Sequence, residues 1–244
     1  MRKFLTVLFL ALQAVCVFSA EHLQLYGIPS ETDLLLERKG FALGYSYKYR
    51  QAMWVCYSLT REQLLKEQVK RSNKFQADPD IPFCPVQPGD YTKTGYDRGH
   101  LAPAADMTYS FDTMLQSFFM SNICPQIPGC NRGIWKRIEN QTRKWALKEG
   151  SLYIITGPIF RGSEKLLGKT DIPIPTGFYK VILDTTPPVK MIAFIAPNQT
   201  TKKRVFSFVA TVDEVEKITG FDFFNMLEDQ LENALEKEAD FSRW

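Results

Sequence analysis

Histidine is scarce in this chain. Only two occur among its 244 residues, and His100 is the only one beyond residue 22. The chain also has no Cys-x-x-Cys motif, so a structural zinc site is not expected. Low-complexity tracts, internal repeats and linkers are absent as well, which indicates one domain rather than two. A neutral-pH general base that no cofactor or tuned carboxylate supplies would therefore have to be His100.

Net charge is also small. The formal charge of +3 includes two basic residues at the N-terminus, and without them it is +1. Bulk charge therefore does not indicate a nucleic-acid partner. Two local clusters of basic residues are more informative, because the second lies on a predicted helix where cations can meet the backbone of a polyanion. For the first cluster a solvated surface is the alternative. The clusters are Lys66, Lys70, Arg71 and Lys74, and then Arg132, Lys136, Arg137, Arg143 and Lys144.

The N-terminus has the features of a secretory signal. A basic pair precedes the apolar run Phe4–Phe18, which is too short to span a bilayer as a helix. Val17 and Ser19 satisfy the small-residue rule for cleavage after Ser19. We therefore predict a signal peptide over residues 1–19, an enzyme domain over residues 20–244, and a secreted or periplasmic protein without stable membrane association after cleavage. An uncleaved anchor is the alternative.

Cleavage leaves four cysteines, which in an exported chain suggest two disulfides with three alternative pairings. Cys124 and Cys130 bracket a turn directly before Asn131. A bridge between them would stiffen that loop if their Cα atoms lie within about 7 Å. The alternative is that both are buried thiols or pair elsewhere. The four residues are Cys56, Cys84, Cys124 and Cys130.

The heptad Asp97–Pro103 brings an acid, a cation, a glycine and the histidine together. Arg98 lies two residues before His100, so it could hold an anionic group beside the imidazole. Gly99 allows a backbone or substrate to approach closely. This combination is typical of phosphate chemistry. A solvated turn is the alternative explanation.

A second motif begins at Asn131, where a segment with helical periodicity runs to Gly150. Asn131 and Glu139 are eight residues apart, a rotation of roughly 80° on a helix, so both side chains can face one cleft. A neutral Asn oxygen suits Mg²⁺, and Glu139 could hold the metal's waters. An N-cap is the alternative role for Asn131. The apolar face contains Ile134, Trp135, Ile138, Thr142, Trp145 and Ala146.

The secondary-structure signals are those of an α+β fold. Aromatic, β-branched and apolar runs predict strands, and two capping boxes, Thr60 with Gln63 and Thr211 with Glu214, predict helix starts. Gly220 separates a short helix from a polar C-terminal one. The predicted strands cover residues 41–50, 52–59, 152–156, 178–184, 190–196 and 205–210.

Together these motifs resemble the DNA/RNA non-specific endonucleases of the ββα-metal, or His-Me finger, group. The resemblance extends more weakly over nearly all of the chain after the leader. It implies an α+β fold with a mainly antiparallel sheet flanked by helices, in which a strand-strand-helix unit holds His100 and Asn131. The matching residues are Asp97–Pro103, Ser121–Ile123 with Pro125 and Gln126, and Asn131–Gly133 with Trp135 and Glu139.

The resemblance also implies an activity: metal-dependent hydrolysis of phosphodiester bonds in DNA and RNA, without sequence preference, to 5′-phosphate products. His100 would be the general base that deprotonates the attacking water. Asn131 would bind Mg²⁺, with Mn²⁺ as a substitute, and Glu139 would orient the metal's waters. Activity through a histidine of ordinary pKa should fall below roughly pH 6 to 7.

Four further residues are predicted to support this chemistry. Arg98 would contact the phosphate, and Asn122 would order the site around the histidine and substrate. Arg71 and Arg132 are predicted to bind substrate, with a plain surface position as the alternative for Arg71. Two other functions stay open: an exported nucleic-acid-binding protein on the same scaffold without turnover, and a phosphodiesterase for small nucleotides. A homodimer is expected only because some members of the group are dimers.

Overall fold

The computed structural model describes residues 23, 27–66 and 68–244. The predicted signal peptide therefore lies outside the described residues. Within the described part, no helix has the length and apolar character needed to cross a membrane.

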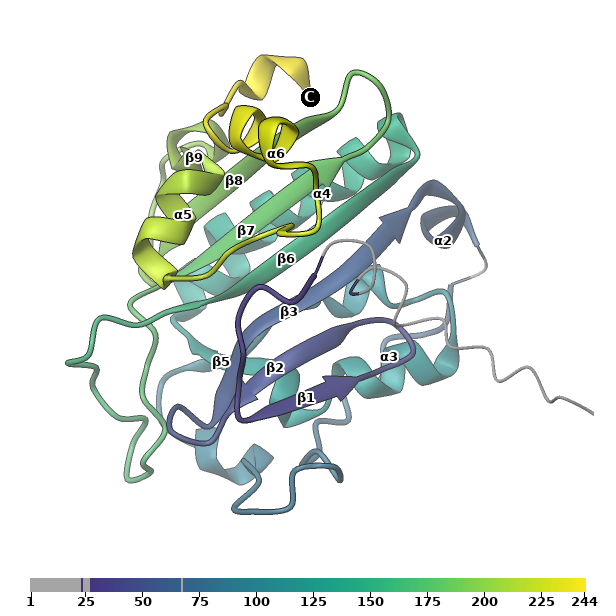
Figure 1. Ribbon diagram of the computed structural model, residues 1–244. Coiled ribbons are helices and arrows are strands. Elements are labelled where there is room, and N and C mark those ends of the chain that lie inside the picture. Colours follow the sequence, from purple (N-terminus) through teal and green to yellow (C-terminus); the bar gives the residue numbers. More distant parts are fainter. Residues whose placement is uncertain (1–22, 24–26, 67) are drawn as a thin grey trace, which may run out of the picture.

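One antiparallel sheet of seven strands forms the centre of the molecule (Figure 1), in the order β1-β2-β3-β6-β7-β8-β9. Strands that follow one another in the chain pair directly, except that β3 pairs with β6. The segment between them, residues 61–150, contains the predicted site motifs. The strands are β1 (Leu34–Glu37), β2 (Ala42–Ser46), β3 (Gln51–Thr60), β6 (Ser151–Ile159), β7 (Gly177–Asp184), β8 (Lys190–Pro197) and β9 (Val209–Ala210).

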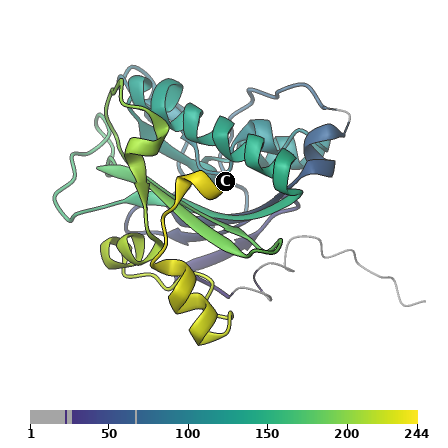
Figure 2. The same ribbon diagram turned by 90° about the horizontal axis from the view of Figure 1, so that it is seen from above.

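Helices cover both faces of this sheet. Seen from above, α4 lies on one side of the sheet, and α5 and α6 lie on the other (Figure 2). The α-helices are α2 (Arg61–Leu65), α3 (Phe111–Ser117), α4 (Lys136–Glu149), α5 (Val212–Thr219) and α6 (Asp229–Glu236), and short 3₁₀ helices cover Pro88–Tyr91, Ala104–Asp106, Met120–Asn122, Val205–Phe208 and Phe241–Arg243.

Strand β7 is mostly apolar on both of its faces, because helices cover both faces of the sheet. All eight of its residues are buried, and successive side chains point to opposite faces. Phe178 and Ile182 join the core under α4, whereas Val181 and Leu183 join the core under α5 and α6. Burying one such apolar side chain contributes about 1.5–3 kcal/mol. The residue between Phe178 and Ile182 on the α4 face is Lys180, which is fully buried.

Both predicted capping boxes are confirmed. The Thr60 hydroxyl accepts from the backbone N–H of Gln63, whose side chain in turn accepts from the N–H of Thr60. The same reciprocal pair joins Thr211 and Glu214 at the start of α5. Gly220 ends α5 with φ of +73°, a left-handed conformation that favours glycine.

The predicted strands over residues 52–59, 152–156, 178–184 and 190–196 are confirmed within three residues at their ends. Two predictions were too long. The strand predicted over residues 41–50 ends at Ser46 in the structure. The chain turns back after that residue, and Arg50 in the turn has a φ of +53°. Residues 205–208 form a 3₁₀ helix, since the N–H of Ser207 bonds locally to Arg204 rather than to β8.

The predicted strand-strand-helix unit is present. Strands β4 (Asp97–His100) and β5 (Ile123–Gln126) form a separate antiparallel pair, and α4 follows. The predicted start of the helix at Asn131 was wrong. A π-helical turn covers Cys130–Trp135, with φ and ψ of −103° and −106° at Gly133, and the regular helix begins only at Lys136.

The prediction of two disulfides is also wrong. Cys84, Cys124 and Cys130 carry free thiols. Cys124 and Cys130 pack in the apolar core under α4, so the alternative of buried thiols describes them. Burial raises the pKa of the Cys130 thiol to about 11. Cys56 packs in the core on the other face of the sheet.

Candidate active site

A cavity of about 400 Å³ opens beside the ββα unit. It brings together most of the residues predicted from the two sequence motifs, although these residues come from separate segments of the chain. The lining includes five cations and the carboxylate of Glu139, so its charge suits an anion. The lining residues are Arg71, Arg98, His100, Pro103, Ala104, Ala105, Asn131, Arg132, Lys136, Glu139 and Arg143.

His100 ends β4, and its buried ring packs against two aromatic side chains that also pack against each other. The ring centroids of Phe75 and Phe118 lie 5.5 and 4.8 Å from that of the imidazole. Nε2 is buried and has no hydrogen-bond partner among the residues that the structure describes. Burial, with a smaller contribution from the positive charge of Arg71, lowers the pKa of His100 to about 3. The imidazole is therefore neutral at pH 7 and able to accept a proton. Protonation of this histidine therefore does not predict a loss of activity below pH 6 to 7.

Gly99 permits the close contact between β4 and β5 that positions His100. A Cβ atom on Gly99 would lie 2.2 Å from the side-chain carbon Cδ of Gln126. A larger residue would therefore displace Gln126, which is fully buried. A close approach occurs at Gly99, but the group that approaches is a side chain of the neighbouring strand rather than the expected backbone or substrate.

Asn122 is buried behind the histidine and is not part of the cavity lining. Its Oδ1 accepts from the N–H of Ala102, and its Nδ2 donates to the carbonyls of Ala102 and Ser117, each at 2.9 Å. These bonds fix the chain directly after His100. Asn122 therefore orders the site from behind rather than through contact with the cavity.

Asn131 has a defined amide orientation. Its Nδ2 donates to Oδ2 of Asp97 at 2.9 Å, and because a carboxylate can only accept, the amide nitrogen must be the atom that faces Asp97. The amide oxygen Oδ1 is thereby directed away from Asp97. This contact, together with the π-helical turn, contradicts the alternative that Asn131 is a plain N-cap of the helix.

Asp97 also holds Arg132. The Nε and Nη2 atoms of Arg132 donate to the two carboxylate oxygens at 2.8 and 2.5 Å. Burial alone would raise the pKa of Asp97, but the hydrogen bonds from Arg132 and Asn131 outweigh it and lower that pKa. The ionised carboxylate thus anchors one cation of the cavity and the oriented amide together. The side chain of Arg132 itself is 72% exposed.

Glu139 is the acidic member of the cavity. Burial and the negative charge of Asp106 raise its pKa to about 7, against the opposing charges of Lys180, Arg143 and Arg71. The side chain can therefore exist in either protonation state near neutral pH, and a cation bound close to it would favour the ionised form.

Two arginines are held over aromatic rings at the cavity. The guanidinium of Arg71 lies 5.0 Å from the ring centroid of Phe118, and that of Arg98 lies 5.3 Å from Phe75. Arg98 also donates to the carbonyl of Pro88 at 2.7 and 3.2 Å. Since these same two rings contact the ring of His100, the two arginines and the histidine pack on one aromatic cluster. The structure places Arg71 in the cavity lining, and its binding of substrate stays a prediction.

A buried polar network behind Glu139 was missed by sequence reasoning. The carboxylate of Asp106 accepts from Nη1 of Arg143 at 2.5 Å and from the hydroxyl of Tyr57 at 3.0 Å. The ammonium of Lys180 lies 3.5 Å from that hydroxyl and 5.4 Å from the ring centroid of Trp135. A lysine inside an otherwise apolar strand could have signalled Lys180. Asp106, in a short loop, had no comparable signal.

Comparison with known proteins agrees with this geometry. The family model for DNA/RNA non-specific endonucleases matches residues 19–230. Nuclease C1 of Cunninghamella echinulata var. echinulata is 35% identical over 227 residues, which cover 86% of this chain and 90% of that protein. The mitochondrial nuclease of Saccharomyces cerevisiae is 31% identical over 238 residues, which cover 88% and 72% of the two chains.

The fold has a counterpart among solved structures. A chain in the crystal structure of the EndoG/EndoGI complex, described as showing the mechanism of EndoG inhibition, superposes with a TM-score of 0.79 at 28% identity. The match covers 85% of this chain and 93% of that chain. The predicted ββα-metal nuclease fold is thereby confirmed. This chain belongs to the DNA/RNA non-specific endonuclease family and is a nuclease.

Proposed function

We propose that this nuclease is a Mg²⁺-dependent endonuclease that hydrolyses DNA and RNA without sequence preference, with His100 as its general base. The observation that carries the proposal is a neutral imidazole in the lining of a cavity that is rich in cations. A base and several phosphate-binding groups are the components that phosphodiester hydrolysis requires.

The cavity favours recognition of the nucleic-acid backbone over the bases. Arginine and lysine side chains bind phosphate irrespective of sequence. Arg98 is partly fixed by its bonds to Pro88 and its position over Phe75, so less of its freedom is lost on contact with a phosphate. This composition supports activity on both DNA and RNA.

The donor set near Asn131 fits Mg²⁺. This ion prefers oxygen ligands, keeps several waters and takes few protein ligands. Asn131 would hold it through Oδ1, the atom that the bond to Asp97 leaves for a ligand, and Glu139 would accept hydrogen bonds from its waters. A bound Mg²⁺, or Mn²⁺ in its place, would supply positive charge beside the reacting phosphate.

The protein's own groups then account for the reaction. His100 accepts a proton from a water as the water oxygen attacks phosphorus. The bond from phosphorus to the 3′ oxygen breaks on the opposite side, so the phosphate stays on the 5′ end of the downstream fragment. Arg98 and Arg71 balance the negative charge that grows on the phosphate oxygens. The displaced 3′ oxygen takes up a proton to give a hydroxyl.

Export through residues 1–19 is part of the proposal. The basic pair and short apolar run at the N-terminus support it. Mass spectrometry of the protein recovered from the secreted or periplasmic fraction is expected to give a chain that begins at Ala20. A chain that begins at Met1 would instead favour the uncleaved anchor.

The deciding experiment measures cleavage of supercoiled plasmid and of a structured RNA, with Mg²⁺ or with EDTA, by the mature protein and by His100→Ala. We expect Mg²⁺-dependent cleavage of both substrates, and a fall of about 10²–10⁴-fold in the variant. Products should accept a 5′ label from polynucleotide kinase only after phosphatase treatment. Binding without cleavage by the intact protein would contradict the proposal, and faster turnover of dinucleotides than of polymers would indicate a small-nucleotide phosphodiesterase.

A further inference from the structure

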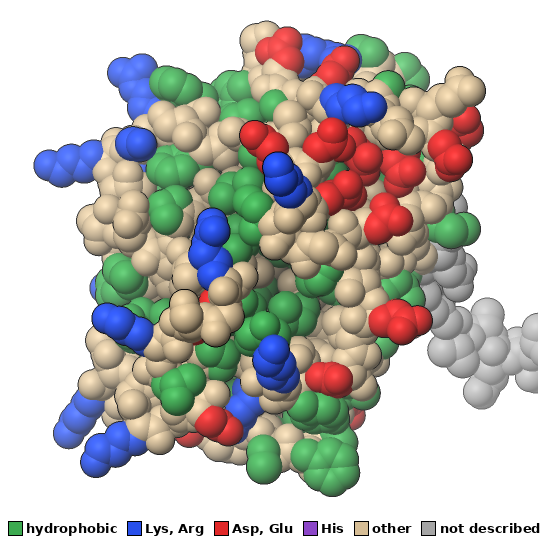
Figure 3. Space-filling view, turned by 60° about the vertical axis from the view of Figure 1, so that its left-hand side comes forward, with side chains coloured by type: hydrophobic (Ala, Val, Ile, Leu, Met, Phe, Trp, Pro, Cys, Tyr) green, Lys and Arg blue, Asp and Glu red, His purple; other side chains and the backbone are tan. Residues whose placement is uncertain are grey.

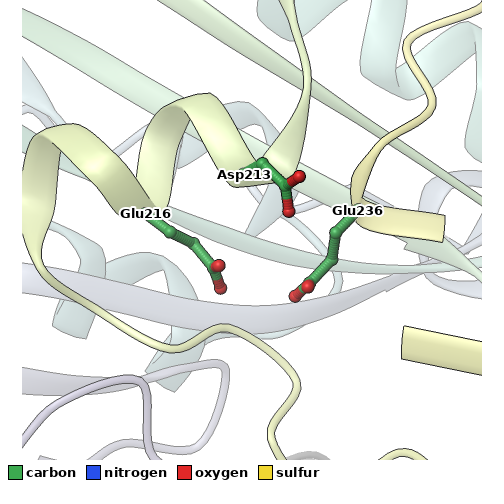
Figure 4. Close-up of side chains that lie close together, drawn as sticks. All are labelled: Asp213, Glu216 and Glu236. Atoms are coloured by element: carbon green, nitrogen blue, oxygen red, sulfur yellow. The ribbon is translucent and has the colours of Figure 1, made fainter. Parts of the chain in front are cut away.

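A group of carboxylates lies on the face of the sheet opposite α4. Asp213 and Glu216 come from α5, and Glu236 is the last residue of α6. One carboxylate oxygen from each lies within 4.8 Å of those of the other two. Figure 4 shows the three side chains converging from the two helices on one space. None of them lines the nuclease cavity.

Glu236 has the most unusual environment of the three. Its side chain is only 7% exposed, and its Oε1 atom is buried without a hydrogen-bond partner in the described part of the chain. An unpaired buried carboxylate oxygen costs free energy. Glu232, one turn earlier on α6, also has a buried Oε1 without a partner among described residues. One oxygen of each of these two carboxyl groups therefore lacks the partner that burial normally requires, while Glu236 also shares a side-chain hydrogen bond with Glu216.

The surroundings of the group are acidic as well. The neighbouring charges that raise the pKa values of Glu216, Glu232 and Glu236 belong to carboxylates, including Asp222 and Asp229. Burial is the first cause, and these like charges add to it. Figure 3 shows acidic side chains gathered toward the upper right of the molecule. A local excess of negative charge attracts cations.

We propose that Asp213, Glu216 and Glu236 form a binding site for a divalent cation of the Ca²⁺ type, which clamps α6 onto α5. Ca²⁺ accepts six to eight oxygen ligands in flexible geometry. Three convergent carboxylates with water in the remaining positions meet that demand, whereas Mg²⁺ requires a stricter octahedron. The unpartnered Oε1 of Glu236 is then a ligand atom.

Glu216 can serve two purposes in this site. Its Oε1 accepts from the backbone N–H of Phe223 at 2.9 Å, which fixes the carboxylate. It also shares a side-chain hydrogen bond with Glu236, and a bound cation would displace the proton of that bond. Phe223 is itself buried in the core under α5 and α6. The contact of α6 with that core includes the nearly buried Leu235, next to Glu236. A cation at this point would hold the end of α6 against a part of the protein that is already fixed.

The test uses the Asn131→Ala protein, so that the metal ligand of the nuclease cavity is removed. Calorimetric titration with CaCl₂ is expected to show one bound ion, and binding should be lost when Glu216→Gln and Glu236→Gln are added. Glu62→Gln, which neutralises an exposed carboxylate on α2, is the matched control and should bind Ca²⁺ unchanged. At Ca²⁺ about 100 times its Kd, the unfolding temperature should rise by about 5–10 °C.

Hydrogen exchange locates the effect. Ca²⁺ should slow exchange of the α6 amides in the Asn131→Ala protein and leave α6 unaffected after the two glutamate substitutions. Absence of Ca²⁺ binding, or equal binding and equal stabilisation with and without those substitutions, would overturn the proposal. Binding of MgCl₂ in preference to CaCl₂ would overturn the assignment of a Ca²⁺-type site.

Discussion

Ionisable side chains on the two faces of the central sheet have opposite surroundings. On the α4 face, acidic and basic groups are interleaved: Asp106 bonds to Arg143, and Asp97 bonds to Arg132. On the α5–α6 face, the charges around Glu236 are carboxylates that repel it. Burial raises the pKa of Glu139 to about 7 and that of Glu236 to about 8, so the same physical cause acts on both.

The difference lies in what surrounds each carboxylate. Cations near Glu139 oppose its protonation, so a further positive charge in the cavity is enough to ionise it near neutral pH. Around Glu236 no such opposing charge contributes among the described residues, so only a proton or an external cation can relieve the repulsion. Balanced charge therefore characterises the proposed catalytic cavity, and unbalanced charge characterises the proposed cation site.

The largest effect is expected from breaking the balance on the α4 face. Arg143→Met leaves the carboxylate of Asp106, whose side chain is 1% exposed, without its ionic partner. Loss of one member of a buried ion pair costs about 3–5 kcal/mol of unfolding free energy. Urea denaturation measures this loss. Lys144→Met, at an exposed position of the same helix, is the control and should change stability by about 0.5 kcal/mol or less; equal effects of the two would contradict a role for the pair.

A smaller effect is expected at Asn131, the proposed metal ligand. Asp97→Ala removes the acceptor that orients the amide of Asn131, so Oδ1 is no longer held in place. Loss of such an orienting partner typically weakens metal affinity by about 10–100-fold. The Mg²⁺ concentration for half-maximal cleavage should rise by this factor. Arg132→Ala removes the other partner of Asp97 and serves as the comparison, because it should alter substrate affinity more than Mg²⁺ affinity.

Much of this site is predictable because its residues are adjacent in the sequence. The strand Asp97–His100 and the segment from Asn131 to Glu139 each place several candidate groups within nine residues or fewer, so short spacings suffice. The capping boxes at Thr60 and Thr211 are likewise local. The family resemblance supplied the pairing of the two strands, which no local pattern contains.

The remainder depends on contacts between distant parts of the chain. Asp106 and Lys180 meet through Tyr57, a residue of β3 that precedes them by 49 and 123 positions. The low pKa of His100 arises from its burial, and the sequence does not show how deeply a strand end is covered. The irregular backbone at Gly133 was hidden by apolar periodicity that continues through it.

The acid limb of the pH profile can separate the roles of Glu139 and His100. The pKa of His100 is lowered to about 3, so the imidazole stays unprotonated, and able to act, down to pH 5 and below. The pKa of Glu139 is raised to about 7, so at low Mg²⁺ activity should fall about tenfold per pH unit below pH 7 as Glu139 becomes protonated. A higher Mg²⁺ concentration favours the ionised form of Glu139. The pH at which activity begins to fall should therefore decrease by about one unit. A limb near pH 6.5 that Mg²⁺ does not move would assign it to the histidine.

The smallest effect is expected on the α5–α6 face, and its sign is opposite to that of Arg143→Met. The pKa of Glu236 is raised to about 8 from an ordinary 4.5, so its contribution to stability is complete below about pH 4.5 and is lost as the pH rises through 8. Glu236→Gln keeps the shape of the neutral carboxyl group and removes the repulsion. In EDTA at pH 8 it should therefore raise the unfolding free energy by about 1 kcal/mol, or the unfolding temperature by about 2–4 °C.

Two controls accompany this measurement. At pH 4.5 the wild-type protein and Glu236→Gln should have the same unfolding temperature. At pH 8 the wild-type protein and Glu62→Gln should also have the same unfolding temperature. A destabilised Glu236→Gln protein at pH 8 would mean that the ionised carboxylate has a stabilising protein partner, and the contrast between the two faces would fail.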